Sequence, residues 1–192
     1  MAFALLLAGV AAAGVLLLRL SRPDSTQRER YLGCRESDPG GWSFFTQTGP
    51  AEPVFGLGGY LEGIPGLGTG PVAAERVMEA DEHRRFLQFS CYDMGLQVFL
   101  DDTLLYTDFP QLENRADAFL SDADPEGIAY DGLRLPLPEG AAGKKLRIVT
   151  YSRSFDGLRQ AVLPTLVSRF SDAAVQTTAM VQTVAVMTAR LL

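Results

Sequence analysis

The segment FLQFSCYDMGLQVFLDDTLLYTDFP, residues 86–110, decides the fold of this chain. Apolar side chains alternate with other side chains in two parts of it, first at Leu87, Phe89 and Cys91 and then at Leu96, Val98 and Leu100. A period of two is typical of half-buried β-strands. Asp101 and Asp102 interrupt the pattern, and carboxylates at such a place favour a solvated turn. The segment therefore predicts a β-hairpin.

The same alternation recurs on both sides of the hairpin. It is present in VAAERVME (72–79), LRLPL (133–137) and LRIVTYS (146–152). Short strands at this spacing, separated by turns, favour an antiparallel sandwich. We therefore predict a mainly β fold, an antiparallel sandwich with its core in residues 72–162. Residues 21–71 are rich in Gly and Pro, which predicts an extended lead-in that lies partly in the sandwich.

Apolar segments flank the predicted sandwich. Residues 2–18 carry no charged side chain, and as a helix they rise about 25 Å, close to the roughly 30 Å of a hydrocarbon core. A cleaved signal peptide has a basic start, which this chain lacks, so residues 1–20 are predicted to be an uncleaved transmembrane anchor. Residues 163–192 contain few turn residues and predict a C-terminal helix that leads toward a membrane region.

The arginines around the anchor give a conflicting signal for its orientation. Arg19, Arg22, Arg28 and Arg30 all follow the apolar run and none precedes it. The positive-inside rule alone would place the following domain in the cytoplasm.

Composition limits the function classes. The 192 residues are enough for one domain with a core, and the formal net charge of −6 argues against nucleic-acid binding, which needs clustered Lys and Arg. The two cysteines, Cys34 and Cys91, are too few for a disulfide scaffold, and they lack the CxxC spacing of a zinc site. One disulfide and two buried thiols are both open at this point.

No residue set in the sequence predicts a catalytic site. Asp122, Asp124 and Glu126 are spaced like the start of a calcium loop, but Leu133 occupies the twelfth position, where a Glu would be needed. His83 is the one histidine and lies among charged residues, which favours a solvated loop position. We therefore predict no enzymatic activity in these residues, no metal site and no cofactor.

Aromatic side chains are the one candidate binding feature. A platform for a carbohydrate or another small molecule is one use for such rings, and core packing is the default. Because the sequence does not separate these two roles, no ligand-binding residue is assigned. The rings considered are Trp42, Phe44, Phe45, Tyr60, Tyr92 and Tyr106.

The segment 86–110, followed by LRLPLPEGAAGKKLRIVTYSRSFDG (133–157), resembles the extracytoplasmic N-terminal β-sandwich of bacterial multi-pass sensors. These sensors include histidine kinases, diguanylate cyclases and the seven-transmembrane receptors with diverse intracellular signalling modules. The likeness covers residues 72–180, although Asp102 stands where the family usually has the hairpin Gly. The resemblance implies that the sandwich is jelly-roll-like, with an anchor before it, membrane helices after it and then an output domain. This chain is expected to be truncated before that output domain.

The resemblance implies that the sandwich faces outward, and we follow it over the arginine count. The expected function is a membrane-anchored extracytoplasmic sensory or ligand-binding domain of a bacterial signal-transduction protein. The alternatives are a stand-alone, surface-attached carbohydrate-binding protein without a signalling role, and an anchored scaffold that faces the cytoplasm. Expected partners are the membrane and a small-molecule or carbohydrate ligand, with no nucleic acid, and a homodimer is left open.

Overall fold

A computed structural model describes residues 30–80 and 84–168, and these residues form a mainly β fold with antiparallel sheets, as predicted. Nearly all of them belong to one unit, Arg30–Leu166. The predicted anchor, residues 1–20, lies outside the described residues. Within the described ranges no helix has the length and apolar character needed to cross a membrane.

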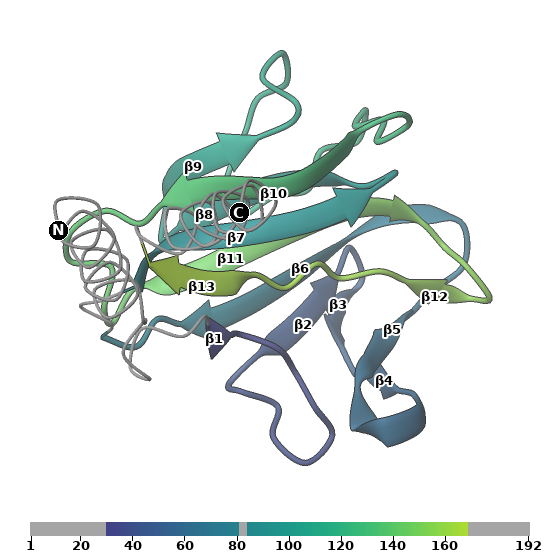
Figure 1. Ribbon diagram of the computed structural model, residues 1–192. Helices are drawn as coiled ribbons and strands as arrows, with labels where there is room; N and C mark the ends of the chain where they lie inside the picture. Colours follow the sequence, from purple (N-terminus) through teal and green to yellow (C-terminus); the bar gives the residue numbers. More distant parts are fainter. Residues whose placement is uncertain (1–29, 81–83, 169–192) are drawn as a thin grey trace, which may run out of the picture. The chain divides into compact units, whose positions relative to one another are not determined.

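The strands form three sheets (Figure 1). The four-stranded sheet has the order β1 (Arg30–Tyr31), β13 (Thr165–Ser168), β7 (Arg84–Tyr92) and β10 (Ala129–Pro136). The six-stranded sheet has the order β3 (Gly49–Ala51), β2 (Ser43–Thr46), β6 (Thr69–Val77), β11 (Lys145–Arg153), β8 (Gly95–Leu100) and β9 (Thr103–Thr107). The small third sheet has the order β12 (Leu158–Arg159), β5 (Leu61–Pro65) and β4 (Val54–Phe55), and the 3-10 turn η2 (Leu57–Gly59) lies between β4 and β5.

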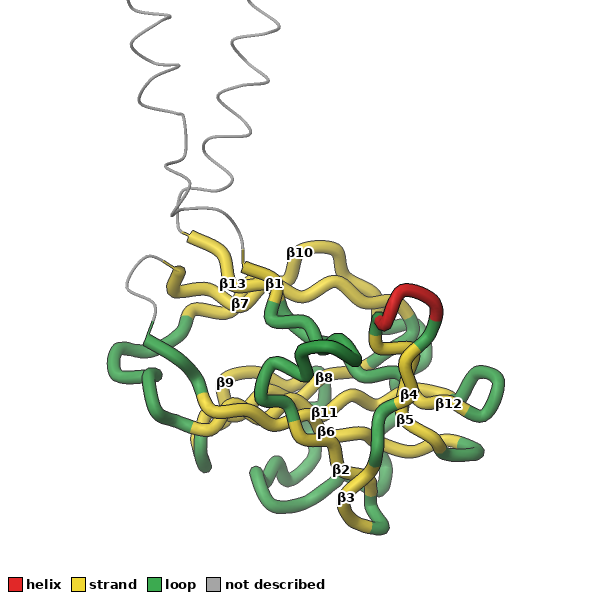
Figure 2. Tube along the Cα trace, turned by 90° about the horizontal axis from the view of Figure 1, so that it is seen from below, coloured by secondary structure: helices red, strands yellow, loops and turns green. Residues whose placement is uncertain are grey.

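The antiparallel pairs of the two larger sheets are nested along the chain. Strands β1, β6, β7 and β8 come first along the chain, and β9, β10, β11 and β13 pair with them in reverse order. The outermost pair is β1 with β13, followed inward by β6 with β11, β7 with β10 and β8 with β9. Successive pairs alternate between the four-stranded and the six-stranded sheet. One two-stranded ribbon therefore supplies both layers of a sandwich-like fold (Figure 2).

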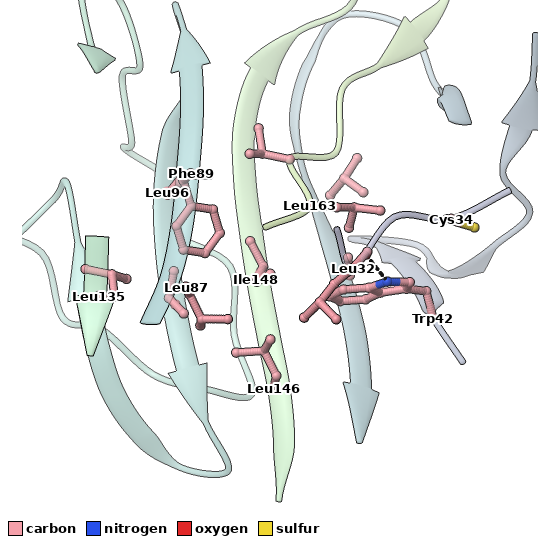
Figure 3. Close-up of a cluster of buried hydrophobic side chains, with 14 of the residues drawn as sticks. Leu32, Cys34, Trp42, Leu87, Phe89, Leu96, Leu135, Leu146, Ile148 and Leu163 are labelled. Atoms are coloured by element: carbon pink, nitrogen blue, oxygen red, sulfur yellow. Dashed lines mark hydrogen bonds between the residues drawn. The ribbon is translucent and has the colours of Figure 1, made fainter. Parts of the chain in front are cut away.

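The main core lies between these two layers. Leu87 and Phe89 of β7 and Leu135 of β10 belong to the same buried cluster as side chains from the six-stranded sheet (Figure 3). The members from β8 and β11 are Leu96, Val98, Leu100, Leu146 and Ile148. The period-two alternation predicted these inward positions, and the structure confirms them.

Strand β8 differs from a half-buried strand because all six of its residues are buried. Gln97 and Phe99, on its other face, are as inaccessible as Leu96 and Val98. The cause is the connection between β9 and β10, residues 108–128, which covers the outer face of the six-stranded sheet with a second apolar cluster. We call this connection the cover segment.

Residues of the predicted lead-in close one edge of the main core. Leu32, Cys34 and Trp42 are buried there, and the Trp42 Nε1 donates a hydrogen bond to the Leu32 carbonyl at 2.7 Å (Figure 3). The Arg76 guanidinium lies 5.5 Å from the Trp42 ring centroid, and burial lowers the pKa of Arg76. The Gly- and Pro-rich residues thus include core side chains as well as turns.

The predicted C-terminal helix was wrong at its start. Residues Thr165–Ser168 form strand β13, which lies between β1 and β7, and Leu163 and Leu166 are part of the main core. Long-range pairing with β1 overrides the local preference of this segment, because the strand completes the edge of a sheet. The remainder of the predicted helix, residues 169–192, lies outside the described residues.

The core predicts a large stability loss for Phe89→Ala. Phe89 is 1% exposed, and truncating a buried Phe typically removes about 3–5 kcal/mol of unfolding free energy. Urea unfolding of the full chain in detergent, followed by the fluorescence of the single tryptophan Trp42, measures this change. Leu57→Ala is the control, because Leu57 is fully exposed and its truncation should leave the midpoint unchanged. Equal midpoints for the two variants would contradict the assigned core.

Candidate functional site

The cover segment is attached to the six-stranded sheet mainly by apolar contacts. Phe109 packs edge-on against Tyr151, with 5.0 Å between ring centroids. Gly95 makes room for it, because a Cβ at this position would lie 2.3 Å from the Phe109 ring. Further along the segment, the contacts come from Leu112, Ala116, Phe119, Leu120, Ala123 and Ile128. A connection of this length without regular structure is uncommon in compact domains and is often functional.

A buried hydrogen-bond network fixes the middle of the cover segment. The Tyr151 hydroxyl donates to the Gln97 Oε1 at 2.5 Å and accepts from the Leu120 backbone N–H at 2.9 Å. The Gln97 Nε2 donates to the Asn114 Oδ1, and the Asn114 amide donates to the carbonyls of Phe109 and Leu112. Both side-chain groups of the fully buried Gln97 therefore have partners, which is what a buried amide requires.

A charged group lies at the edge of the cover segment. Glu75 of β6 and Arg147 of β11 are direct cross-strand neighbours, and the Arg147 Nη1 donates to the Glu75 Oε1 at 2.5 Å. The Lys145 Nζ lies 3.3 Å from the other carboxylate oxygen, Oε2. The Arg147 guanidinium also lies 5.3 Å from the ring centroid of Phe119 in the cover segment. The Glu75 and Arg147 side chains are only 14% and 11% exposed, so this ion pair is largely buried between Lys145 and Phe119.

These charged residues form part of an open depression of about 540 Å³. The hairpin turn between β8 and β9 contributes Asp101 and Asp102, and the cover segment contributes Ala116 and Asp117. The two strands contribute the charged group, Glu75, Lys145 and Arg147. Six of these seven residues are charged, and the volume lies within the range of small-molecule sites, about 300–1,000 Å³. The depression is the candidate functional site.

The hairpin turn is fixed in position at the rim of the depression. Asp101 has a φ of +50°, which Asp tolerates better than most residues, and its backbone N–H donates to the Lys145 carbonyl at 2.8 Å. Its side-chain Oδ1 accepts from the Lys145 N–H at 2.9 Å. The predicted role of Asp101 and Asp102 as turn residues is therefore confirmed, and both carboxylates also line the depression.

The depression has the chemistry of a binding site for a polar ligand. Its carboxylates accept hydrogen bonds, while Lys145 and Arg147 donate them. A hydrogen bond from Arg115 lowers the pKa of the exposed Asp117, so this carboxylate is charged at neutral pH. The described residues contain no group of three or more His, Cys, Asp or Glu side chains arranged to hold a metal ion.

Other residues considered in the sequence lie elsewhere. Asp122 and Asp124 are in the cover segment; the Asp124 Oδ1 accepts the Glu126 backbone N–H, and Glu126 pairs with Arg153 at 2.9 Å. No disulfide joins Cys34 and Cys91. His83 lies outside the described residues.

The six aromatic residues considered as a platform do not gather at one surface. Trp42 and Phe44 are in the main core, Phe45 packs against the second cluster, and Tyr106 is half-buried against the main core. Tyr60 and Tyr92 are exposed. None of the six lines the depression.

Four residues of the depression were not predicted from the sequence as site residues: Glu75, Lys145, Arg147 and Asp117. A signal for two of them was present, because Glu75 and Arg147 each interrupt an apolar run at an outward position. Opposite charges placed directly across an antiparallel pair attract each other. The register of β6 against β11 was needed to recognise them as neighbours.

Comparisons with known proteins returned no match: no family model, no curated protein and no solved structure is similar to this chain.

The hydrogen-bond network predicts that Tyr151→Phe destabilises the protein by about 1–3 kcal/mol, because the buried Gln97 Oε1 and the Leu120 N–H both lose their partner. Hydrogen exchange should increase most in residues 109–120. Urea unfolding and hydrogen-exchange mass spectrometry measure the two effects. Tyr92→Phe, at an exposed tyrosine, is the control and should change neither. If exchange in residues 109–120 of Tyr151→Phe increased no more than in the rest of the protein, the network would be contradicted.

The same tyrosine predicts a loss of stability at alkaline pH. Burial raises the pKa of Tyr151 from 10.0 to about 12. The folded state therefore holds this proton more tightly than the unfolded state, so its contribution is complete below pH 10 and is lost as the pH rises toward about 12. Urea midpoints measured across this range should fall less steeply in Tyr151→Phe than in the unsubstituted chain. Some slope should remain, because burial also raises the pKa of Tyr106.

Proposed function

We propose that this protein is a membrane-anchored extracytoplasmic sensory domain of a bacterial signal-transduction protein, with a jelly-roll-like sandwich that binds a small polar ligand. Its role in these residues is binding rather than catalysis. The nested strand pairs, the position of the two ends of the sandwich and the depression support the proposal.

The nested pairing supports the jelly-roll assignment. A jelly roll has eight strands in two sheets and contains two Greek keys. Here the eight strands of the ribbon, in chain order, divide as first, eighth, third and sixth in one sheet and second, seventh, fourth and fifth in the other. Strands β2 and β3 extend the second of these sheets at its β6 edge.

The observation that carries the sensory role is the pairing of the first and last strands. Arg30 of β1 is directly opposite Leu166 of β13, so the chain enters and leaves the sandwich at neighbouring strands. A ligand shifts a conformational equilibrium when it binds two arrangements with different affinity. Because the two ends are hydrogen-bonded neighbours, a rearrangement of the sandwich would act on both flanking segments together.

The depression supports ligand binding. It lies beside the β8–β9 turn and the cover segment, and its side chains come from parts of the chain that are distant in sequence. A ligand that contacts Asp101, Asp117 and Arg147 would link the turn, the cover segment and the central strand β11. The bound state would therefore differ from the free state in how firmly these three elements are held together.

The proposed orientation predicts that Leu57→Cys is labelled on intact cells by a membrane-impermeant maleimide, once the outer membrane has been made permeable. Leu57 is fully exposed in the turn η2, so its substitution offers an accessible thiol. The unsubstituted chain provides the background, because Cys34 is buried and Cys91 is half-buried. If labelling required cell lysis, the sandwich would lie in the cytoplasm, which is the orientation that the arginines indicate. That result would overturn the proposal.

A further inference from the structure

The cover segment lies on the six-stranded sheet without backbone pairing. Beyond Asp108, and within the described residues, its backbone–backbone hydrogen bonds are donated by Leu112, Ala118 and Ile128, and all of them go to carbonyls of the segment itself. Strand β11 beneath it differs, because it is paired with β6 along its whole length and with β8 along most of it. Separation of the cover segment from the sheet would therefore leave every strand pair intact.

Side chains make the central polar contacts between the cover segment and the strands. The Tyr151 hydroxyl accepts from the Leu120 N–H, and the Gln97 Nε2 and the Thr107 hydroxyl both donate to the Asn114 Oδ1. Water can replace each partner, because a hydrogen bond inside a protein is exchanged for one to water when it breaks. The sheet face beneath the cover thus carries polar groups that would be hydrated on opening, which lowers the free energy needed to expose it.

The two ends of the cover segment are suited to act as hinges. At the first end, the Asp108 N–H donates to the Leu96 carbonyl at 3.0 Å, and the Asp108 Oδ2 accepts from the Leu96 N–H at 2.7 Å. At the second end, Gly127 has a φ of +77°, and a Cβ there would meet no atom within 4 Å beyond its chain neighbours. The adjacent ion pair, Glu126 with Arg153, is 69% and 67% exposed, and such surface pairs contribute little.

We propose that the cover segment is a lid. It opens as a unit while both sheets stay folded, and it uncovers the outward side chains Phe99, Val149 and Tyr151 of the six-stranded sheet. Local opening of this kind needs less free energy than global unfolding. The lid supplies the second arrangement that the proposed sensory role requires. The inference rests on the proposed function for the use of the lid, whereas the opening itself does not depend on it.

Two neighbouring residues of β11 provide a matched pair of cysteine variants. Val149 and Ile148 are both 0% exposed, but Val149 belongs to the second cluster under the cover segment and Ile148 to the main core. The full chain in detergent micelles is treated with a maleimide, and peptide mass spectrometry reads each cysteine separately from Cys34 and Cys91. Val149→Cys should be labelled about tenfold faster than Ile148→Cys or more, because only the lid has to open.

The dependence on urea separates local opening from global unfolding. Labelling of Val149→Cys should change little at low urea, because lid opening exposes little surface, whereas labelling of Ile148→Cys should rise steeply. Phe89→Leu, added to each variant, loosens the main core alone. It should speed labelling of Ile148→Cys and leave labelling of Val149→Cys unchanged.

Hydrogen exchange of the unsubstituted chain gives the same test without a cysteine variant. The Leu120 N–H, bonded to the Tyr151 hydroxyl, should exchange faster than the Ile148 N–H of β11 and with a smaller dependence on urea.

The lid would be overturned by equal labelling rates in Val149→Cys and Ile148→Cys, by an equal dependence of the two rates on urea, or by equal exchange at the Leu120 and Ile148 N–H groups. Each of these results would show that the cover segment leaves the sheet only when the whole domain unfolds. The orientation of the domain is measured separately by labelling of Leu57→Cys on cells, so failure of the lid is distinguishable from failure of the proposed function.

Discussion

Burial of strand β11 on both faces is the constraint on which the rest of the structure depends. Its inward side chains, Leu146 and Ile148, are in the main core, while its outward side chains Val149 and Tyr151 are in the second cluster. A shift of register by one residue would exchange these faces and place Arg147 in the main core. The strand is therefore fixed by two apolar layers at once, and its neighbours β6 and β8 are fixed through it.

The candidate site lies on the six-stranded sheet, at the margin of the second apolar cluster. Beside the last part of the second cluster, Glu75 and Arg147 are largely buried and neutralise each other's charge. Burying either charge alone would cost several kcal/mol, so the pair is tolerated only as a pair. Asp101 of the hairpin turn and Ala116 of the cover segment line the same depression. Charged groups from two strands, the hairpin turn and the cover segment are thus concentrated at this depression.

Strand alternation made much of the fold predictable from residues 72–152. The inward faces of β7, β8 and β11 follow directly from the pattern of apolar residues, and the turn at Asp101 follows from its carboxylates. The predicted helix from Leu163 failed at Thr165–Ser168, because pairing with β1 depends on a segment more than a hundred residues earlier. The candidate site was not predicted, because its side chains meet only when β6 lies beside β11 and the cover segment lies across both.

The sequence by itself determined which side chains of the central strands face the main core, because a strand places alternate residues on opposite sides and apolar residues are driven to the buried side. Only the tertiary structure decided that the opposite face is also covered, with Gln97 and Tyr151 joined to Asn114 and Leu120. The physical reason is that periodicity is a local property of the chain, whereas the cover and the charged depression are made by contacts between distant segments.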